Sequence, residues 1–335
     1  MNVTQTRLRR ILWVMLVGVC LYGALAIYRG VDKMRDALAG YAWWTLVAAC
    51  ALAFGNYVLR FFKWEFYLAR LGIKNVTKSD SFLTFLSGFV LTVTPGKVGE
   101  VFKSLVLKET HNVPVAVTAP IVVAERVTDL IGIIVLIVIG SLGFSGGLFW
   151  AGVGSTLVFV LLVVVASRSL SLGIIHVIGR MPGPFARIAP KLRDAYESLA
   201  TLVAPSNLLF PTLLSVIAWS LECASLWIIV RGFGANADLK LCAFFYATST
   251  LAGALVPVPG GLGVTEKALE EQLVNLGHVS PGAATASMIL VRFATLWFAV
   301  LVGFVALSRL KKRYPTLLQS SEAPAESAES LQKAP

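Results

Sequence analysis

Apolar residues run along most of this chain in long stretches, and polar residues gather in short blocks between them. A helix needs about 20 mostly apolar residues to cross the hydrocarbon core of a bilayer. We therefore predict an all-α polytopic membrane protein with about six full transmembrane helices. These helices are expected over residues 11–29, 41–59, 115–140, 148–167, 209–230 and 284–307.

Two further apolar runs are shorter, and each ends where proline and glycine interrupt the helical pattern. They cover residues 81–94 and 243–258. A 14-residue helix rises only about 21 Å, which is less than the roughly 30 Å thickness of the bilayer core. We therefore expect residues 81–110 and 243–277 to form two re-entrant helical hairpins, each entering and leaving the membrane on one side.

The two interrupted regions resemble each other in sequence. The first contains TPGKVGE, residues 94–100, and the second contains PVPGGLGVTE, residues 257–266. Glu100 lies 26 positions before Arg126, and Glu266 lies 26 positions before Arg292. A shared break, carboxylate, spacing and arginine indicate an internal duplication. The expected repeats cover about residues 41–140 and about residues 209–307.

The distribution of positive charge predicts the orientation of the chain. Lys and Arg gather in four blocks and give a net charge of +11. Cytoplasmic loops carry an excess of Lys and Arg, so we place these blocks and both termini in the cytoplasm, with the protein in the inner membrane. The two hairpins then enter from opposite sides, as in transporters built from inverted repeats. No nucleic-acid partner is needed to explain this charge. The blocks are residues 7–10, 60–78, 168–193 and 309–313.

Composition favours a membrane-embedded domain over a soluble one. The chain is 57% hydrophobic and 14% charged, and its mean hydropathy is +0.78, more apolar than a soluble domain of this length can bury. We assign residues 1–313 to one transmembrane domain. Residues 314–335 are rich in Ala, Ser, Pro and Glu and are predicted to form a disordered cytoplasmic tail. A signal peptide is the alternative interpretation of the first apolar segment.

Metal and cofactor chemistry find no support in the sequence. The four cysteines lie in or next to apolar segments without CxxC spacing, so we interpret them as small core residues. His111, His176 and His278 are far apart, and neither a Walker A nor an HExxH pattern is present. We expect no bound metal and no cofactor.

The breaks expose backbone groups that lipid cannot satisfy, so they must be buried in protein or line a wet cavity. Proline ends the incoming helix, and glycine allows positive φ and close backbone approach. The helix after each break would present its amides to an anionic group, with Glu100 and Glu266 near its first turn. Structural hairpin tips with merely capping glutamates are the alternative. The break residues assigned to the site are Pro95, Gly96, Gly99, Pro259, Gly260, Gly261 and Gly263.

Charged residues inside apolar spans indicate function, because each costs about 2.5–3.5 kcal/mol at a helix centre on insertion scales. Asp129 follows Arg126 by three residues and is expected to hold it. Glu125 or Glu100 is then left for another partner. We assign all four side chains to the candidate site.

Arg292 has no acidic residue near it in sequence, so it needs a distant partner such as Glu266 or Glu222. We predict that Arg126 and Arg292 bind the phosphate of a lipid head group, because a guanidinium offers two parallel donors to such a group. An ion-pair lock between helices is the alternative.

Basic and aromatic residues alternate with apolar ones over residues 60–70. Arg60, Lys63, Trp64 and Tyr67 fall on one helical face. This pattern predicts a helix face at the membrane interface, where Arg60 and Trp64 would contact acidic lipid head groups. Ordinary topological anchoring is the alternative.

Four motifs in this order make the chain resemble the lysylphosphatidylglycerol synthase transmembrane region family, whose members are flippase-like membrane proteins. The resemblance covers about residues 10–310 and implies a lipid-translocating module. Bifunctional members also carry a soluble aminoacyl-transferase domain, but only a short polar tail follows Arg313 here, so lipid aminoacylation is not expected. Related members are linked to polyprenyl-phosphate, phospholipid or hopanoid handling. The motifs are RFFKW (60–64), TPGKVGE (94–100), ERVTD (125–129) and PVPGGLGVTE (257–266).

The sequence therefore favours a lipid transporter over an enzyme. The expected cargo is an anionic lipid or a lipid-linked phosphate of the polyprenyl-phosphate type, with its head group held between the two hairpins. A lipid-biosynthetic protein is the expected partner. Two alternatives stay open: a membrane-embedded enzyme that modifies a lipid head group, and a scaffold for such an enzyme.

Overall fold

A computed structural model describes residues 37–94, 99–142, 149, 152, 155–156, 196–256 and 258–317. All regular structure in these residues is helical, as the apolar pattern predicts. The expected span at 11–29 and all of the expected span at 148–167 except residues 149, 152 and 155–156 lie outside the described residues, as do Pro95 and Gly96. The helices are α3 (Trp44–Arg70), α4 (Lys78–Ser87), α5 (Phe102–His111), α6 (Val115–Ser141), α10 (Pro205–Gly232), α11 (Leu239–Leu255), α12 (Val264–Asn275), α13 (Pro281–Arg292) and α14 (Phe298–Arg313).

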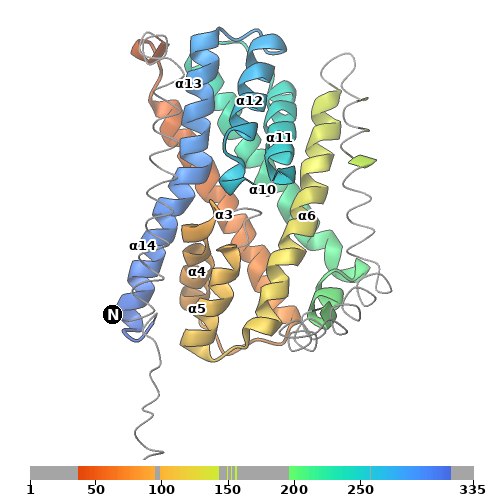
Figure 1. The fold of residues 1–335 in the computed structure, drawn as a ribbon, viewed down its shortest axis with the longest axis vertical. Helices are drawn as coiled ribbons and strands as arrows, with labels where there is room; N and C mark the ends of the chain where they lie inside the picture. Colours follow the sequence, from red (N-terminus) through yellow and green to blue (C-terminus); the bar gives the residue numbers. More distant parts are fainter. Residues whose placement is uncertain are drawn as a thin grey trace, which may run out of the picture.

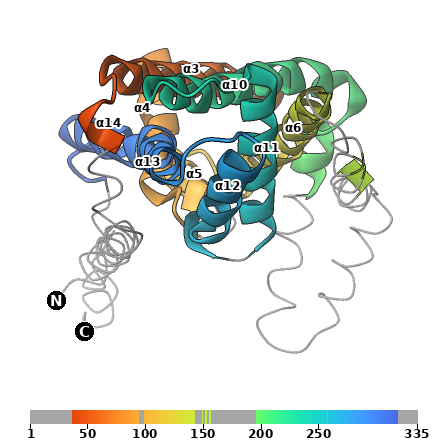
Figure 2. The ribbon, with the colours of Figure 1, turned by 90° about the horizontal axis from the view of Figure 1, so that it is seen from above.

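Long helices form the frame of the molecule. Helices α3 and α10 lie side by side in one layer, while α14, α6 and the shorter helices form a second layer (Figures 1 and 2). In the described part of the chain, three stretches are long and apolar enough to cross a membrane, namely α3, residues 206–232 of α10, and α13 with α14. Helix α6 is as long as α3, but three charged residues interrupt its apolar sequence at positions 125, 126 and 129.

The two short apolar runs form helices that stop near the middle of the molecule. Helix α4 continues into a 3-10 turn, Gly88–Leu91, before the first break, and α5 follows that break. Helix α11 leads through the second break, which contains the 3-10 turn Pro259–Gly261, into α12. In Figure 1, α4 and α5 occupy the half opposite to α11 and α12. A Cβ atom placed on Gly260 would lie 3.4 Å from Cγ1 of Val93, so the two breaks touch.

The helix that leads into each break packs against the long helix that follows the other break. Helix α11 contacts α6, and α4 contacts α14. Glycine permits both close approaches, because a Cβ atom on Gly140 would lie 2.8 Å from the Lys240 carbonyl oxygen, and one on Gly303 would lie 2.7 Å from the Val90 nitrogen. Small residues at helix contacts have this effect in membrane proteins generally. We call the segments around the first and the second break, about residues 41–140 and about residues 209–307, the first and the second unit. Because each unit contributes a helix that packs against the other, the two units are in close contact.

The start of the predicted tail is ordered. Residues 314–317 form a turn in which the Tyr314 hydroxyl donates to the Asp80 carboxylate over 3.0 Å, and the Leu317 side chain is buried. These residues pack onto the helices instead of extending from them. Residues 318–335 lie outside the described part of the chain.

Candidate functional site

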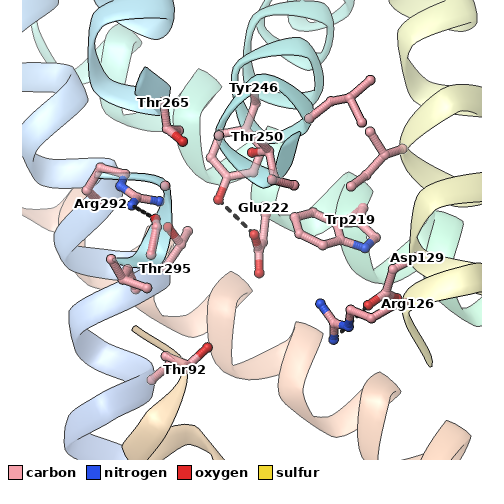
Figure 3. A pocket seen from close by; sticks show the side chains of 18 of the residues that line it. Thr92, Arg126, Asp129, Trp219, Glu222, Tyr246, Thr250, Thr265, Arg292 and Thr295 are labelled. Atoms are coloured by element: carbon pink, nitrogen blue, oxygen red, sulfur yellow. Dashed lines mark hydrogen bonds and ion pairs between the residues drawn. The ribbon is translucent and has the colours of Figure 1, made fainter. Parts of the chain in front are cut away.

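A cavity of about 270 Å³ lies where the two breaks meet, and both units contribute to its lining. The first unit supplies Thr92 and Thr94 before its break, and the second supplies Gly260 and Gly261 within its break. Figure 3 shows that side chains from helices on both sides point into this space. The charged residues of the lining are Arg60, Arg126, Asp129, Glu222 and Arg292.

A cluster of ion pairs surrounds the first break. Arg126 Nη2 lies 3.1 Å from Glu100 Oε2 and 3.1 Å from Asp129 Oδ2. Arg60 Nη2 lies 3.4 Å from the same Glu100 oxygen. The Arg126–Asp129 pair agrees with the prediction from the sequence, which left Glu125 or Glu100 for another partner. The structure instead gives Glu100 two arginines, one from α3 and one from α6.

Two lysines extend this cluster away from the cavity. Lys63 Nζ lies 2.6 Å from Asp129 Oδ1 and donates to Ser215 Oγ over 2.8 Å. Lys103 Nζ lies 2.6 Å from Glu125 Oε2 and 4.6 Å from the centre of the Trp64 ring. These buried side chains join α3, α5, α6 and α10. Buried charges are tolerated when paired and hydrogen-bonded in this way.

The second break is built around one arginine. Arg292 Nε lies 2.6 Å from Glu266 Oε1, and Arg292 Nη2 donates to the Gly260 carbonyl oxygen over 2.7 Å. The other Glu266 oxygen accepts a hydrogen bond from the Gly263 amide over 2.6 Å, which confirms the expected position of this glutamate in the first turn of α12. A π-helical turn, Phe293–Trp297, follows Arg292 directly.

Left-handed backbone at the second break explains its glycines. Gly260, Gly261 and Gly263 have φ values of 62°, 69° and 87°, which cost little for glycine and more for other residues. At the first break, Thr94 Oγ1 accepts a hydrogen bond from the Gly99 amide over 2.7 Å. This bond joins Thr94, the last described residue before the break, to Gly99, the first described residue after it.

The same ion pair occurs in both units. Glu100 pairs with Arg126, and Glu266 pairs with Arg292, and the partners are 26 positions apart in each case. In each unit the glutamate comes from the segment after the break, and the arginine comes from the next long helix. The spacing found in the sequence therefore corresponds to a contact in space.

The sequence does not assign Glu222 to the site, but the structure places it in the cavity. It lies on α10, and its Oε2 accepts a hydrogen bond from the Tyr246 hydroxyl over 2.7 Å. Figure 3 shows Glu222 between Arg292 on one side and Arg126 on the other. Trp219, one turn earlier on α10, also lines the cavity. A lone carboxylate inside the apolar run 209–230 was the available signal.

Ten of the predicted site residues fall into three groups. Six of them line the cavity or its breaks directly, while Glu100 and Glu266 are buried behind the arginines that they hold. Glu125 and Trp64 are fully buried in the lysine-containing part of the cluster and do not line the cavity. The residues in contact with the cavity are Arg60, Arg126, Asp129, Arg292, Gly260 and Gly261.

The expectation of an interfacial face on α3 is wrong. Arg60, Lys63, Trp64 and Tyr67 do share one face of the helix, but all four are buried. This face meets α4, α5 and α6, where ion pairs and aromatic rings satisfy its charges. Periodicity identified the face correctly, but the charges on it belong to the protein interior rather than to the membrane surface.

An exposed apolar rim adjoins the cavity at the end of α11. The side chains of Leu255 and Val256 are 52% and 38% exposed, and Leu255 also lines the cavity. The space thus has guanidinium groups inside and an apolar edge outside. Such an arrangement suits a molecule with an anionic head and an apolar tail.

Comparison with known proteins gives consistent matches. The family model described as "Lysylphosphatidylglycerol synthase TM region" matches residues 11–303. A UPF0104 membrane protein of Methanocaldococcus jannaschii is 25% identical over 223 residues, which cover 65% of this chain and 92% of the relative. A second UPF0104 membrane protein from the same organism is 21% identical over 309 residues, which cover 86% of this chain and 91% of the relative.

Proposed function

This chain belongs to the lysylphosphatidylglycerol synthase transmembrane region family, and we propose that it moves an anionic lipid between the leaflets of a membrane. The observation that carries the proposal is the cavity between the breaks, which contains a guanidinium group from each unit. Arg126 and Arg292 would hold the phosphate of the head group. The lipid would leave chemically unchanged, so the protein is a transporter rather than an enzyme.

The membrane setting of the proposal is the inner membrane, with both termini in the cytoplasm. In this setting α4–α5 and α11–α12 are re-entrant hairpins that enter from opposite leaflets. Irregular backbone at membrane depth is tolerated where it is buried or lines a wet cavity. The contact between Val93 and Gly260 supports this arrangement, because it brings the two breaks together midway between the hairpin ends.

Cavity size favours a head group over a whole lipid. The volume of about 270 Å³ is close to the roughly 300 Å³ at which small-molecule pockets begin. The acyl or polyprenyl chains would remain in the bilayer and pass over the apolar rim at Leu255 and Val256. Binding would replace part of the internal pairing of Arg126, whose side chain is 24% exposed, by contacts to phosphate oxygens.

Transport of labelled phosphatidylglycerol in proteoliposomes tests the proposal. We expect the wild-type protein to accelerate exchange between leaflets, and Arg126→Gln and Arg292→Gln each to lower the rate at least about tenfold, since a charge-assisted hydrogen bond contributes about 1.5–3 kcal/mol. Lys267→Gln is the control, because its side chain is 67% exposed on α12. Thermal unfolding in detergent establishes that each variant is folded.

Three outcomes would contradict the proposal. Equal rates in folded Arg126→Gln, Arg292→Gln and wild-type protein would remove the arginines from the mechanism. Recovery of a chemically altered head group from the vesicles would indicate an enzyme instead. Absence of any lipid movement by the purified protein would favour a scaffold for a lipid-biosynthetic partner.

A further inference from the structure

A second hollow lies outside the cavity between the breaks. It is a groove of about 480 Å³ lined by α3, α4 and α14, and α4 packs against both of the other helices (Figures 1 and 2). Nine of its twelve lining side chains are apolar, and the other three are Ser79, Arg309 and Arg313. No described residue lines both this groove and the cavity. The groove is therefore a separate feature with an apolar body and a basic end.

The apolar body of the groove opens toward lipid. Leu301 and Val305 line it with side chains that are 54% and 55% exposed, and both lie in the membrane-length stretch formed by α13 and α14. On α14 the lining runs from Phe298 to Arg313, 15 positions later, which is a rise of about 22 Å. This length exceeds half of the roughly 30 Å bilayer core, so one acyl chain of one leaflet can lie along the groove.

The basic end of the groove carries one compensated and one uncompensated arginine. Arg313 Nη1 lies 2.7 Å from Asp80 Oδ1 and donates to Ser79 Oγ over 3.0 Å, which holds this guanidinium against the start of α4. Arg309, one turn earlier on α14, is exposed and forms no ion pair with any residue that the structure describes. This end of the groove thus keeps a net positive charge.

Topological anchoring alone does not explain this arrangement. The positive-inside bias places basic residues at the cytoplasmic end of a span but does not select a face of the helix. Lys311 and Lys312 lie at the same end of α14 without lining the groove, whereas Arg309 and Arg313 are four positions apart and share the face that does. Charge and shape together match an anionic phospholipid, whose phosphate pairs with guanidinium groups while its chain covers the apolar wall.

We propose that this groove binds one anionic phospholipid, with its phosphate at Arg309 and one acyl chain along α14. The lipid is retained at the protein surface and is distinct from the lipid that is transported. It would brace α4, the helix that leads into the first break. Leu86 lines the groove, and Phe89, three residues later, lines the cavity, so the bound chain lies directly behind one wall of the cavity.

Lipid titration of the delipidated protein, followed by native mass spectrometry, tests this site. The probes are dioleoyl phosphatidylglycerol and dioleoyl phosphatidylcholine, which share their chains and their phosphodiester but differ in net charge. The wild-type protein should prefer phosphatidylglycerol at least about fivefold, the effect expected of one basic side chain beside an anionic head group. Arg309→Gln should remove most of this preference.

Two control variants accompany the titration. Lys311→Gln removes an equal charge from the same turn of α14 but from outside the groove, so it should keep the wild-type preference. The double variant Arg126→Gln with Arg292→Gln removes the two cations proposed to hold the transported lipid. The preference for phosphatidylglycerol should persist in this variant, because the groove is unchanged.

Photo-crosslinking locates the bound chain. Phosphatidylglycerol with a diazirine on one acyl chain should label peptides from α4 and α14, and unlabelled phosphatidylglycerol should compete better than phosphatidylcholine. Crosslinks of the groove to the predicted span at residues 11–29, or between two copies of the chain, in place of lipid adducts would assign the groove to protein and overturn the proposal.

The other outcomes distinguish this site from the transport site. Equal affinity for the two lipids, or an equal loss of preference in Lys311→Gln and Arg309→Gln, overturns the groove site. Loss of the preference in the folded double variant assigns the bound lipid to the cavity and also overturns it. A preference that depends on Arg309 in a protein that moves no lipid supports the groove site and contradicts only the proposed function.

Discussion

The two breaks differ in the number of buried charged side chains that form ion pairs beside them. At the first break, five charged side chains form a connected set of ion pairs, and the Lys103–Glu125 pair lies next to this set, where Lys63 donates to the Glu125 backbone carbonyl oxygen. At the second break, Arg292 holds one carboxylate, Glu266, and one backbone carbonyl, that of Gly260. A glutamate–arginine pair with the same spacing thus lies within a larger set of ion pairs at the first break and apart from that set at the second.

This difference predicts different mechanical roles. Removing a member of a buried network leaves other charges uncompensated, so the first break should behave as a rigid wall of the cavity. The second break contains three glycines with positive φ, and the exposed apolar rim lies beside it. Arg292 donates a hydrogen bond to the Gly260 carbonyl oxygen within this break. A phosphate that attracts Arg292 would therefore also act on the backbone of the break. We expect lipid entry at this second side.

The largest expected effect tests the rigidity of the first side. Lys103→Met should lower the free energy of unfolding by about 3–5 kcal/mol, because it leaves Glu125 buried without its nearest cation. Reversible unfolding in mixed detergent micelles measures this change. The double variant Lys103→Met with Glu125→Leu should recover most of the loss, since removing both charges also removes the desolvation cost. If the double variant is no more stable than the single one, the pair is not the source of the stability.

The corresponding substitution beside the second break should lower the free energy of unfolding by a smaller amount. Arg292→Met leaves Glu266 with the hydrogen bond from the Gly263 amide, so we expect a loss of about 1–3 kcal/mol in the same unfolding assay. A loss as large as that of Lys103→Met would abolish the distinction between a rigid and an adaptable side.

Backbone at the second break provides a narrower test. Gly261 and Gly234 have similar φ values of 69° and 74°, but a Cβ atom on Gly261 would lie 2.7 Å from Thr265 Oγ1, whereas one on Gly234 meets open space. Alanine at either position should cost about 1–2 kcal/mol for the left-handed conformation. Gly261→Ala should cost at least about 1 kcal/mol more through overpacking. Equal losses of unfolding free energy would show that the break relaxes freely.

The smallest expected effect lies outside the cavity, where α4 begins. Partial burial raises the pKa of Asp80, but hydrogen bonds from Arg313, Tyr314 and Thr77 outweigh it and hold this pKa below its ordinary value. A depressed pKa contributes stability above the unfolded value of 3.8, and this contribution is lost as the pH falls through the folded value. Because Arg313 is half exposed, we expect less than about 1 kcal/mol.

Asp80→Asn measures this contribution directly. The variant should be slightly less stable than the wild-type protein at pH 7, and the difference should shrink as the pH is lowered below about 4. A difference that persists unchanged at low pH would assign the effect to packing rather than to charge. The comparison is unaffected by the cavity, because Asp80 and Arg313 lie at the end of the molecule away from both breaks.

Features that are local in the chain could be predicted from the sequence. Apolar runs predicted the long helices, and proline and glycine predicted the end of α11, because helix length and backbone conformation depend on nearby residues. Helix α4 ends earlier than its apolar run, at Ser87, and continues as the 3-10 turn Gly88–Leu91. The 26-residue spacing of Glu100 with Arg126 and of Glu266 with Arg292 also became visible as a repeated pattern, and both pairs are in contact.

The contacts of a charged side chain could not be predicted where its partner comes from a distant segment of the chain. The face of α3 that carries Arg60 and Trp64 looked like a membrane-interface helix, because basic and aromatic residues occur in both settings. Only α5 and α6, packed against it, show that its charges are paired inside the protein. The ion pair between Lys103 and Glu125 likewise could not be predicted, because no residue near Lys103 in the sequence indicates that Glu125 is its partner.

The sequence by itself determined that this is a helical membrane protein with two related breaks, each followed by a glutamate and an arginine at a fixed distance. Tertiary structure alone decided that the breaks meet, that one is fixed by a charge network, and that Glu222 lies between their arginines. The physical reason is that helix formation and membrane insertion are set by neighbouring residues. Pairing of buried charges is decided only when segments far apart in the chain come together.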